Sequence, residues 1–158
     1  MTQRPSVITD ELRAKIGVEE PPAVYEVDKT GCRMFARAVG YTDPLFYDEG
    51  FAKSKGYRSI PVPPGFLGHR VYDPREAVTE GAEIRLMMPY QRVLNGGTDI
   101  EYLDTICAGD LLTVTGTALE SLQEREGRQG PMLVATSRHT YRRGDKVVAI
   151  HRGTLIFY

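Results

Sequence analysis

Apolar residues change their spacing near the middle of the chain, from a helical period in the first half to a strand period in the second. In residues 28–48, four apolar positions recur at i, i+3, i+4 and i+7, which places them on one face of a helix. Asp28 or Thr30 is suited to the N-cap of this helix, and Gly40 to its left-handed C-terminal cap. The four apolar positions are Cys32, Phe35, Ala36 and Val39.

Alternation of apolar and polar residues, which is typical of strands, dominates from Val93 onwards. The last three predicted strands follow one another through tight turns, so we expect them to form an antiparallel meander. Residues 59–68 hold three prolines and two glycines and are predicted to form a rigid loop. The predicted strands are 23–27, 93–103, 111–124, 132–142 and 147–158, and shorter helices are predicted within 6–16 and 49–55.

One long helix followed by a twisted antiparallel sheet predicts the fold class. The apolar face of the sheet needs a cover, and the helix that begins near residue 28 is the only large candidate. We therefore expect an α+β hot-dog fold, an antiparallel β-sheet wrapped around a long central helix, as a single domain over residues 1–158. This arrangement leaves an exposed edge strand, so we expect the chain to dimerise.

The composition narrows the class of protein further. A formal net charge of −1 argues against a nucleic-acid-binding protein, which would show a concentrated basic excess. No apolar run approaches the length of a membrane span, and the N-terminal residues lack a signal-peptide core. Cys32 and Cys107 have neither metal-ligand spacing nor a secretory context, so no metal site and no disulfide are expected. These features predict a soluble cytoplasmic domain.

Two segments carry a family resemblance. Residues 35–66, FARAVGYTDPLFYDEGFAKSKGYRSIPVPPGF, resemble the signature of MaoC-like (R)-specific enoyl-CoA hydratases and acyl dehydratases. Residues 92–143 are similar to the N-terminal, fatty-acid-synthase-type branch of that superfamily, through their Asn-Gly-Gly and Ala-Gly-Asp turns and a Gly-x-x-Gly-Pro hairpin. Together the resemblance covers about residues 24–158 and implies the hot-dog fold.

The family's catalytic motif is not intact in this chain. The resemblance implies a helix that ends in Gly-Asp-x-Asn-Pro-x-His, whose Asp and His activate the water that adds to the enoyl-CoA double bond. Gly40 and Pro44 match this motif, and Asp43 stands at the Asn position. Tyr41 and Phe46 stand at the Asp and His positions, and neither a phenol with a pKa near ~10 nor a phenyl ring replaces that acid–base pair at neutral pH. The chain alone is therefore predicted not to be a competent hydratase.

Other candidates have a functional and a structural interpretation. Pro64, Gly65 and Phe66 stand where the family has a loop that presents a backbone N–H to the thioester oxygen, or they form a proline-stiffened turn. His69 is either a displaced general base or a structural histidine. His139 and His151 are predicted to pair across neighbouring strands.

Asn95 and Gly96 also have two interpretations. They make room for an acyl chain or a pantetheine arm, or they allow the strand to bend around the helix. A group of basic residues near the hairpin turns is a candidate for the phosphates of coenzyme A or a solvated hairpin end. These basic residues are Arg125, Arg128, Arg142, Arg143, Lys146 and Arg152.

The resemblance implies a role as one subunit of an enoyl-CoA hydratase or acyl dehydratase. This chain would shape the acyl-CoA pocket, and a partner hot-dog subunit would supply Asp and His. The coenzyme A thioester is the substrate and no other cofactor is expected. A non-catalytic acyl-CoA-binding homodimer is the alternative, and activity of the chain alone through Tyr41, Asp43 or His69 is a third reading. The expected substrate-binding residues are Tyr41, Asp43, Phe46, Pro64, Gly65, Phe66, Asn95 and Gly96.

Overall fold

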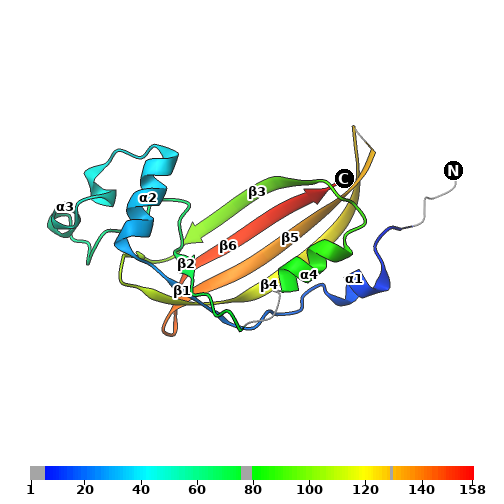
Figure 1. Cartoon of the computed structure of the whole chain (residues 1–158), viewed down its shortest axis with the longest axis horizontal. Coiled ribbons are helices and arrows are strands. Elements are labelled where there is room, and N and C mark those ends of the chain that lie inside the picture. The colour runs from blue at the N-terminus through cyan, green and yellow to red at the C-terminus, as the bar shows by residue number, and fades with distance from the viewer. Residues whose placement is uncertain (1–5, 76–79, 129) are drawn as a thin grey trace.

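The computed structural model describes residues 6–75, 80–128 and 130–158 (Figure 1). Their strands form one six-stranded antiparallel sheet in the order β2-β1-β4-β5-β6-β3. The predicted meander is confirmed, because β4, β5 and β6 are neighbours in chain order. The strands are β1 (Ala23–Glu26), β2 (His69–Arg70), β3 (Val93–Tyr102), β4 (Leu111–Gly127), β5 (Gly130–Arg143) and β6 (Lys146–Phe157).

The predicted central helix forms as α2, and its ends are set by local residues. The Asp28 carboxylate, rather than Thr30, caps the helix by accepting the Gly31 N–H at 2.8 Å. Gly40 ends it in the left-handed conformation with φ of 80°. Within the described residues, none of the helices is long and apolar enough to span a membrane. The helices are α1 (Asp10–Ala14), α2 (Lys29–Val39), the 3₁₀ helix η1 (Pro44–Phe46), α3 (Glu49–Ser54) and α4 (Glu80–Met87).

The first of two hydrophobic clusters joins α2 to one end of the sheet. Cys32 of α2 is fully buried there, with Phe66 and Leu67 of the proline-rich loop. Phe35 packs against this cluster and places its ring 5.4 Å from that of Phe66. The other buried members are Val27, Ile60, Ile106, Ala108, Leu112, Val114, Tyr141, Val148 and Ala149.

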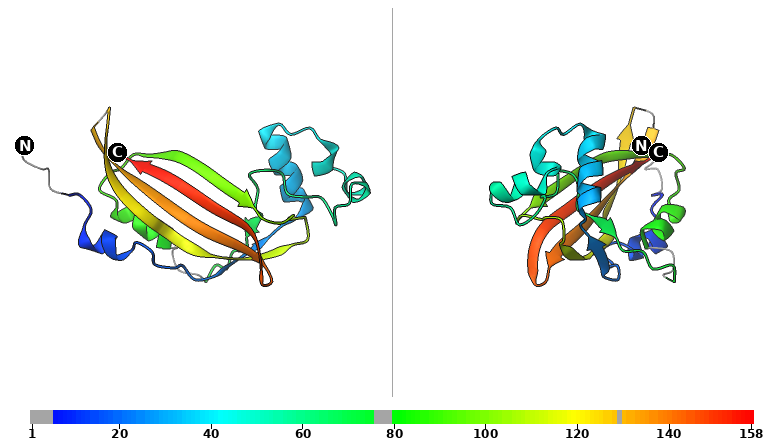
Figure 2. Two further views of the ribbon diagram at one scale, coloured as in Figure 1. Left: turned by 180° about the vertical axis from the view of Figure 1, so that it is seen from behind. Right: turned by 60° about the vertical axis from the view of Figure 1, so that its left-hand side comes forward.

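The second cluster covers the other end of the sheet through α1 and α4, so α2 is not the only cover (Figures 1 and 2). Tyr141 of the first cluster and Leu133 of the second are both odd-numbered residues of β5, so the two clusters lie on the same face of the sheet. The sequence did not predict α4, which lies in the polar stretch before β3. The second cluster consists of Leu12, Ile84, Met88, Leu119, Leu122, Leu133, Ala135 and Phe157.

Strand β3 forms one edge of the sheet. It pairs with β6 along its length, and in the described chain no other strand pairs with it. A β-bulge interrupts the pairing between Asn95 and Gly97, as expected for paired glycines in a strand. Most residues of β3 are exposed, so its outer edge is free to accept a further strand. The predicted α+β class and antiparallel sheet are confirmed.

Candidate functional site

A cavity of about 580 Å³ opens where the turn after α2, the proline-rich loop and the β3–β4 connection meet. This volume is in the range of small-molecule sites in proteins. The wall is mostly apolar, with a few polar groups that could orient a ligand. The lining residues are Leu45, Phe46, Tyr57, Pro61, Val62, Pro64, Tyr102, Leu103, Asp104, Thr105 and Ile106.

The turn after α2 carries two aromatic residues, Tyr41 and Phe46, at the positions that the sequence resemblance predicts to match the family's Asp and His. The rings of Tyr41 and Phe46 lie 5.7 Å apart, and Phe46 belongs to the cavity wall. Asp43 caps η1 instead of facing a ligand, because its Oδ1 accepts the Leu45 N–H at 2.9 Å. The hydroxyl of Tyr47 donates to the carbonyl of Tyr41 and holds the turn closed. The turn therefore contributes part of the cavity wall, and its residues 41–47 do not present an Asp–His pair to the cavity.

The proline-rich loop is bound to β3 through Tyr102. Gly65 has φ of 98°, and a Cβ there would lie 3.0 Å from the Phe35 ring, so only glycine fits without strain. The Gly65 N–H donates to the Tyr102 hydroxyl at 3.0 Å, and that hydroxyl donates to the Phe66 carbonyl at 3.1 Å. The Phe66 N–H is bonded to the Pro63 carbonyl at 3.0 Å. Burial raises the pKa of Tyr102, so the hydroxyl stays protonated at neutral pH.

The structure brings five of the eight predicted binding residues together, while Asp43 caps η1 and two others lie elsewhere. Tyr41, Phe46 and the segment 64–66 meet around the cavity and Tyr102. Asn95 and Gly96 lie near the opposite end of β3 from Tyr102. There, the Asn95 Oδ1 accepts the Gly97 N–H at 2.9 Å.

Close packing accounts for Gly96. A Cβ at Gly96 would lie 2.9 Å from the Thr154 side chain and 3.0 Å from that of Ile156. The contacts of Asn95 and Gly96 are thus those of a strand bend, and neither residue is among those that line the cavity.

His69 lies beside the first turn of α2 and is not among the residues that line the cavity. Its ring meets Phe66 edge-on, with 5.1 Å between the centroids. The His69 Nε2 and the Asp28 Oδ2 both lie within 3 Å of the point that a Cβ on Gly31 would occupy, at 2.7 and 2.9 Å. A carboxylate therefore lies near His69, and this proximity was not predicted because 41 positions separate the two residues.

The predicted cross-strand histidine pair is confirmed. His139 of β5 lies opposite His151 of β6, with 6.1 Å between ring centroids. His139 Nε2 contacts the Glu20 carboxylate at 3.1 Å. Burial, and next the nearby His139, lower the pKa of His151. The pair lies between the two hydrophobic clusters and away from the cavity wall.

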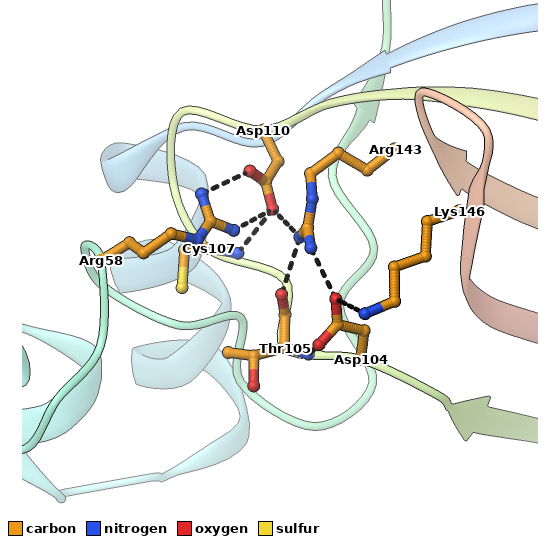
Figure 3. Close-up of polar contacts among 7 residues, drawn as sticks. All are labelled: Arg58, Asp104, Thr105, Cys107, Asp110, Arg143 and Lys146. Atoms are coloured by element: carbon orange, nitrogen blue, oxygen red, sulfur yellow. Dashed lines mark hydrogen bonds and ion pairs between the residues drawn. The ribbon is translucent and has the colours of Figure 1, made fainter.

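Behind the cavity wall, a buried carboxylate binds two arginines (Figure 3). Asp110 accepts two hydrogen bonds from Arg58, one from Arg143 and one from the Cys107 N–H, all at 3.0 Å. Burial alone would raise the pKa of Asp110, but these hydrogen bonds outweigh burial and the pKa lies below its usual value. The carboxylate therefore stays ionised and holds three segments together.

A second carboxylate extends this network to the cavity itself. Asp104 accepts from Arg143 at 2.6 Å, from Lys146 at 2.8 Å and from the Thr105 N–H at 2.9 Å. The hydrogen bond from Lys146, and then that from the Thr105 N–H, lower the pKa of Asp104 to about 2. Arg143 also donates to the Thr105 carbonyl at 2.8 Å. Because Asp104 and Thr105 line the cavity, the network fixes one wall of it.

Four residues of this region were not predicted from the sequence to belong to the site: Arg58, Tyr102, Asp104 and Asp110. Arg143 and Lys146 were candidates for phosphate binding, but both bind carboxylates of the chain itself. One sequence feature pointed to this network. Asp104 and Asp110 lie on either side of the apolar run from Ile106 to Ala108, and a carboxylate that is buried beside such a run needs charged partners.

Sequence comparison places this chain in a known family. The family model described as "FAS1-like, dehydratase domain region" matches residues 14–151. A UPF0336 protein of Streptomyces avermitilis is 34% identical over 113 residues, covering 71% of this chain and 73% of the relative. A UPF0336 protein of Thermobifida fusca is 30% identical over 139 residues, covering 82% of each chain.

Solved structures share the fold at low sequence identity. A chain of the ChsH1-ChsH2 complex from Mycobacterium tuberculosis matches with a TM-score of 0.74 at 14% identity, over 94% of this chain and 87% of that one. A chain of the truncated HadBC (3R-hydroxyacyl-ACP dehydratase) complex from the same organism matches with a TM-score of 0.70 at 21% identity, over 95% and 99%. The (R)-hydratase from A. caviae matches with a TM-score of 0.57 at 15% identity, over 89% and 94%. These similarities confirm the predicted hot-dog fold.

Proposed function

Because this chain belongs to the family of FAS1-like dehydratase domain regions and has the MaoC-like hot-dog fold, we propose that it is the non-catalytic, acyl-binding subunit of a heteromeric enoyl-CoA hydratase or acyl dehydratase. One observation carries the proposal: the rings of Tyr41 and Phe46, the residues that the resemblance aligns with the family's Asp and His, lie 5.7 Å apart beside a cavity of ligand size. The site keeps the scaffold of the reaction and lacks its acid–base pair.

The remaining polar groups of the cavity support a binding role over a catalytic one. Among the residues that line it, Asp104 is the only carboxylate, and its pKa of about 2 makes it a weak base at neutral pH. Its oxygens are already bound to Arg143, Lys146 and Thr105. The apolar remainder of the wall suits an acyl chain.

The free edge of β3 supports pairing with a second hot-dog chain. A partner strand that added to β3 would extend the sheet and cover the exposed residues of that edge. Two structures that share the fold are described as the ChsH1-ChsH2 complex and the HadBC complex, so heteromeric assembly has precedents within this fold.

In such an assembly the partner supplies the chemistry. Its His and Asp take a proton from water, the water oxygen bonds to C3 of the enoyl thioester, and a proton is delivered to C2. A backbone N–H stabilises the thioester oxygen while it carries enolate charge. This chain binds the acyl thioester and excludes water from it.

The proposal extends to the setting of the reaction. We place the chain in the cytoplasm and in fatty-acid metabolism, with a coenzyme A thioester as substrate and no other cofactor. Cys32 and Cys107, both buried as free thiols, support a reducing compartment.

Co-expression with a hot-dog protein that carries Gly-Asp-x-Asn-Pro-x-His tests this function. We expect a stable complex that hydrates crotonyl-CoA, an inactive chain alone, and a partner that is slower alone than in the complex. A matched complex whose partner carries Ala at the motif His should form and be inactive. A chain that binds butyryl-CoA as a homodimer and adds nothing to any such partner would instead be an acyl-CoA-binding homodimer.

A further inference from the structure

We propose that Tyr102 sets the affinity of the site for acyl thioesters, because its hydroxyl occupies the position that the thioester oxygen takes when a ligand binds. This inference rests on the proposed function, and it takes the Gly65 N–H as the backbone N–H that stabilises the thioester oxygen. It assigns a specificity-determining role to a residue outside the family's motif.

The geometry of Tyr102 is that of an internal substitute for a ligand oxygen. Tyr102 is one of the residues that line the cavity, the residue is 38% exposed, and the hydrogen bond between its hydroxyl and the Gly65 N–H is exposed to solvent, so a ligand in the cavity can reach the hydroxyl. The hydroxyl oxygen is 3.0 Å from the Gly65 nitrogen, the distance at which a thioester carbonyl would accept the same hydrogen. Both oxygens therefore compete for one donor.

The loop around Gly65 holds the Gly65 N–H in place, so a ligand carbonyl should replace the Tyr102 hydroxyl as acceptor without movement of that N–H. The Phe66 N–H donates to the Pro63 carbonyl within the turn, and the Phe35 ring lies 3.0 Å from the point that a Cβ on Gly65 would occupy. The N–H of Gly65 is thus held in one direction. A ligand oxygen gains it by displacing the Tyr102 hydroxyl, without opening the turn.

The chemistry of the two acceptors gives the exchange its selectivity. The Tyr102 hydroxyl is neutral, since burial raises its pKa. A thioester oxygen gains negative charge in the enolate, and hydrogen bonds to charged acceptors are stronger than those to neutral ones. A ligand that has no carbonyl has nothing to exchange, so it should bind with no contribution from this donor.

Binding of two coenzyme A derivatives to wild type and Tyr102→Phe tests the inference. Butyryl-CoA carries the thioester carbonyl and S-butyl-CoA, a thioether of the same chain length, does not. We expect Tyr102→Phe to bind butyryl-CoA about 2- to 10-fold more tightly by calorimetry, because one competing hydrogen bond is lost. The affinity for S-butyl-CoA should not change. Tyr72→Phe, which alters a phenol that is 76% exposed and is not among the residues that line the cavity, should change neither affinity.

Hydrogen exchange of the Gly65 amide provides a measurement that needs no ligand. The exchange should be faster in Tyr102→Phe than in wild type and in Tyr72→Phe. Equal changes for the two coenzyme A derivatives, weaker binding of butyryl-CoA alone, or an unchanged Gly65 exchange rate would overturn the role of Tyr102. If wild type binds neither derivative while its Gly65 amide is protected, the proposed function fails, and the inference fails with it.

Discussion

The two ends of the sheet are covered in different ways. At the helix-covered end, α1 and α4 place apolar side chains on the sheet to complete the second cluster. At the ligand end, which comprises α2, η1, α3 and the 59–68 loop, the first cluster supplies apolar packing, and polar contacts also hold the loop and the β3–β4 connection beside an open cavity. Apolar packing is dense and leaves little space, whereas directional hydrogen bonds hold segments apart at fixed distances. Substitutions at the helix-covered end should therefore change mainly the stability, and substitutions at the ligand end should change the affinity for the ligand.

The largest effect on stability should come from the helix-covered end. Leu133 is completely buried in the second cluster, so Leu133→Ala should lower the free energy of unfolding by about 2–5 kcal/mol in urea titrations. The folded variant should bind butyryl-CoA like wild type. Leu86→Ala on α4 is a control, because Leu86 is 84% exposed and should cost less than about 0.5 kcal/mol. A loss of affinity in Leu133→Ala would show that the two ends are coupled.

Asp110→Asn should have a smaller effect on stability and act at the ligand end. The change removes an anion that binds Arg58 and Arg143, and we expect a loss of about 2 kcal/mol because both arginines reach solvent and recover part of their hydration. The cavity wall at Thr105 should loosen, and butyryl-CoA should bind more weakly. Asp99→Asn, at a carboxylate 3.9 Å from Arg152 and 74% exposed, is the matched control and should change neither quantity.

Acid should weaken the ligand end first. Asp104 has a folded-state pKa of about 2 against an ordinary value of 3.8, and the pKa of Asp110 is also lowered. Their contribution to stability is complete above the ordinary value and declines as the pH falls from about 4 towards 2, because the unfolded chain takes up protons first. Urea titrations at several pH values should show this decline, and Asp104→Asn should reduce its slope. An unchanged slope would contradict the network.

Gly65→Ala should have the smallest effect on stability and a clear effect on binding. With φ of 98° and the Phe35 ring 3.0 Å from the added Cβ, we expect a loss of about 1 kcal/mol. The N–H should also turn away from its acceptor, so butyryl-CoA affinity should fall. Gly17→Ala, just after α1, has φ of 79° and open space around its Cβ, so it places backbone strain of a similar kind away from the cavity. Equal affinities in the two variants would contradict the role of the loop.

The sequence predicted what depends on neighbours in the chain. Asp28 and Gly40 set the ends of α2 through contacts within four residues, and the alternation of β4 to β6 gave the meander. Contacts between distant segments were not visible: Arg58 and Asp110 are 52 positions apart, and Gly65 and Tyr102 are 37 apart. Asn95 and Gly96 were predicted to bind substrate because glycine pairs suit both a ligand and a bulge, and only the register of β3 shows the bulge. Helix α4 was not predicted because the apolar residues in the stretch around it do not recur at a clear helical or strand period.

Hydration of crotonyl-CoA by the assembled complex tests the central claim most directly. The assay compares the complex, each subunit alone, and complexes in which either His69 of this chain or the motif His of the partner is replaced by Ala. We predict that His69→Ala leaves the rate unchanged, that loss of the partner's motif His abolishes it, and that this chain alone gives no turnover. Turnover by this chain alone that disappears in His69→Ala would contradict the account and place the catalytic base in this subunit.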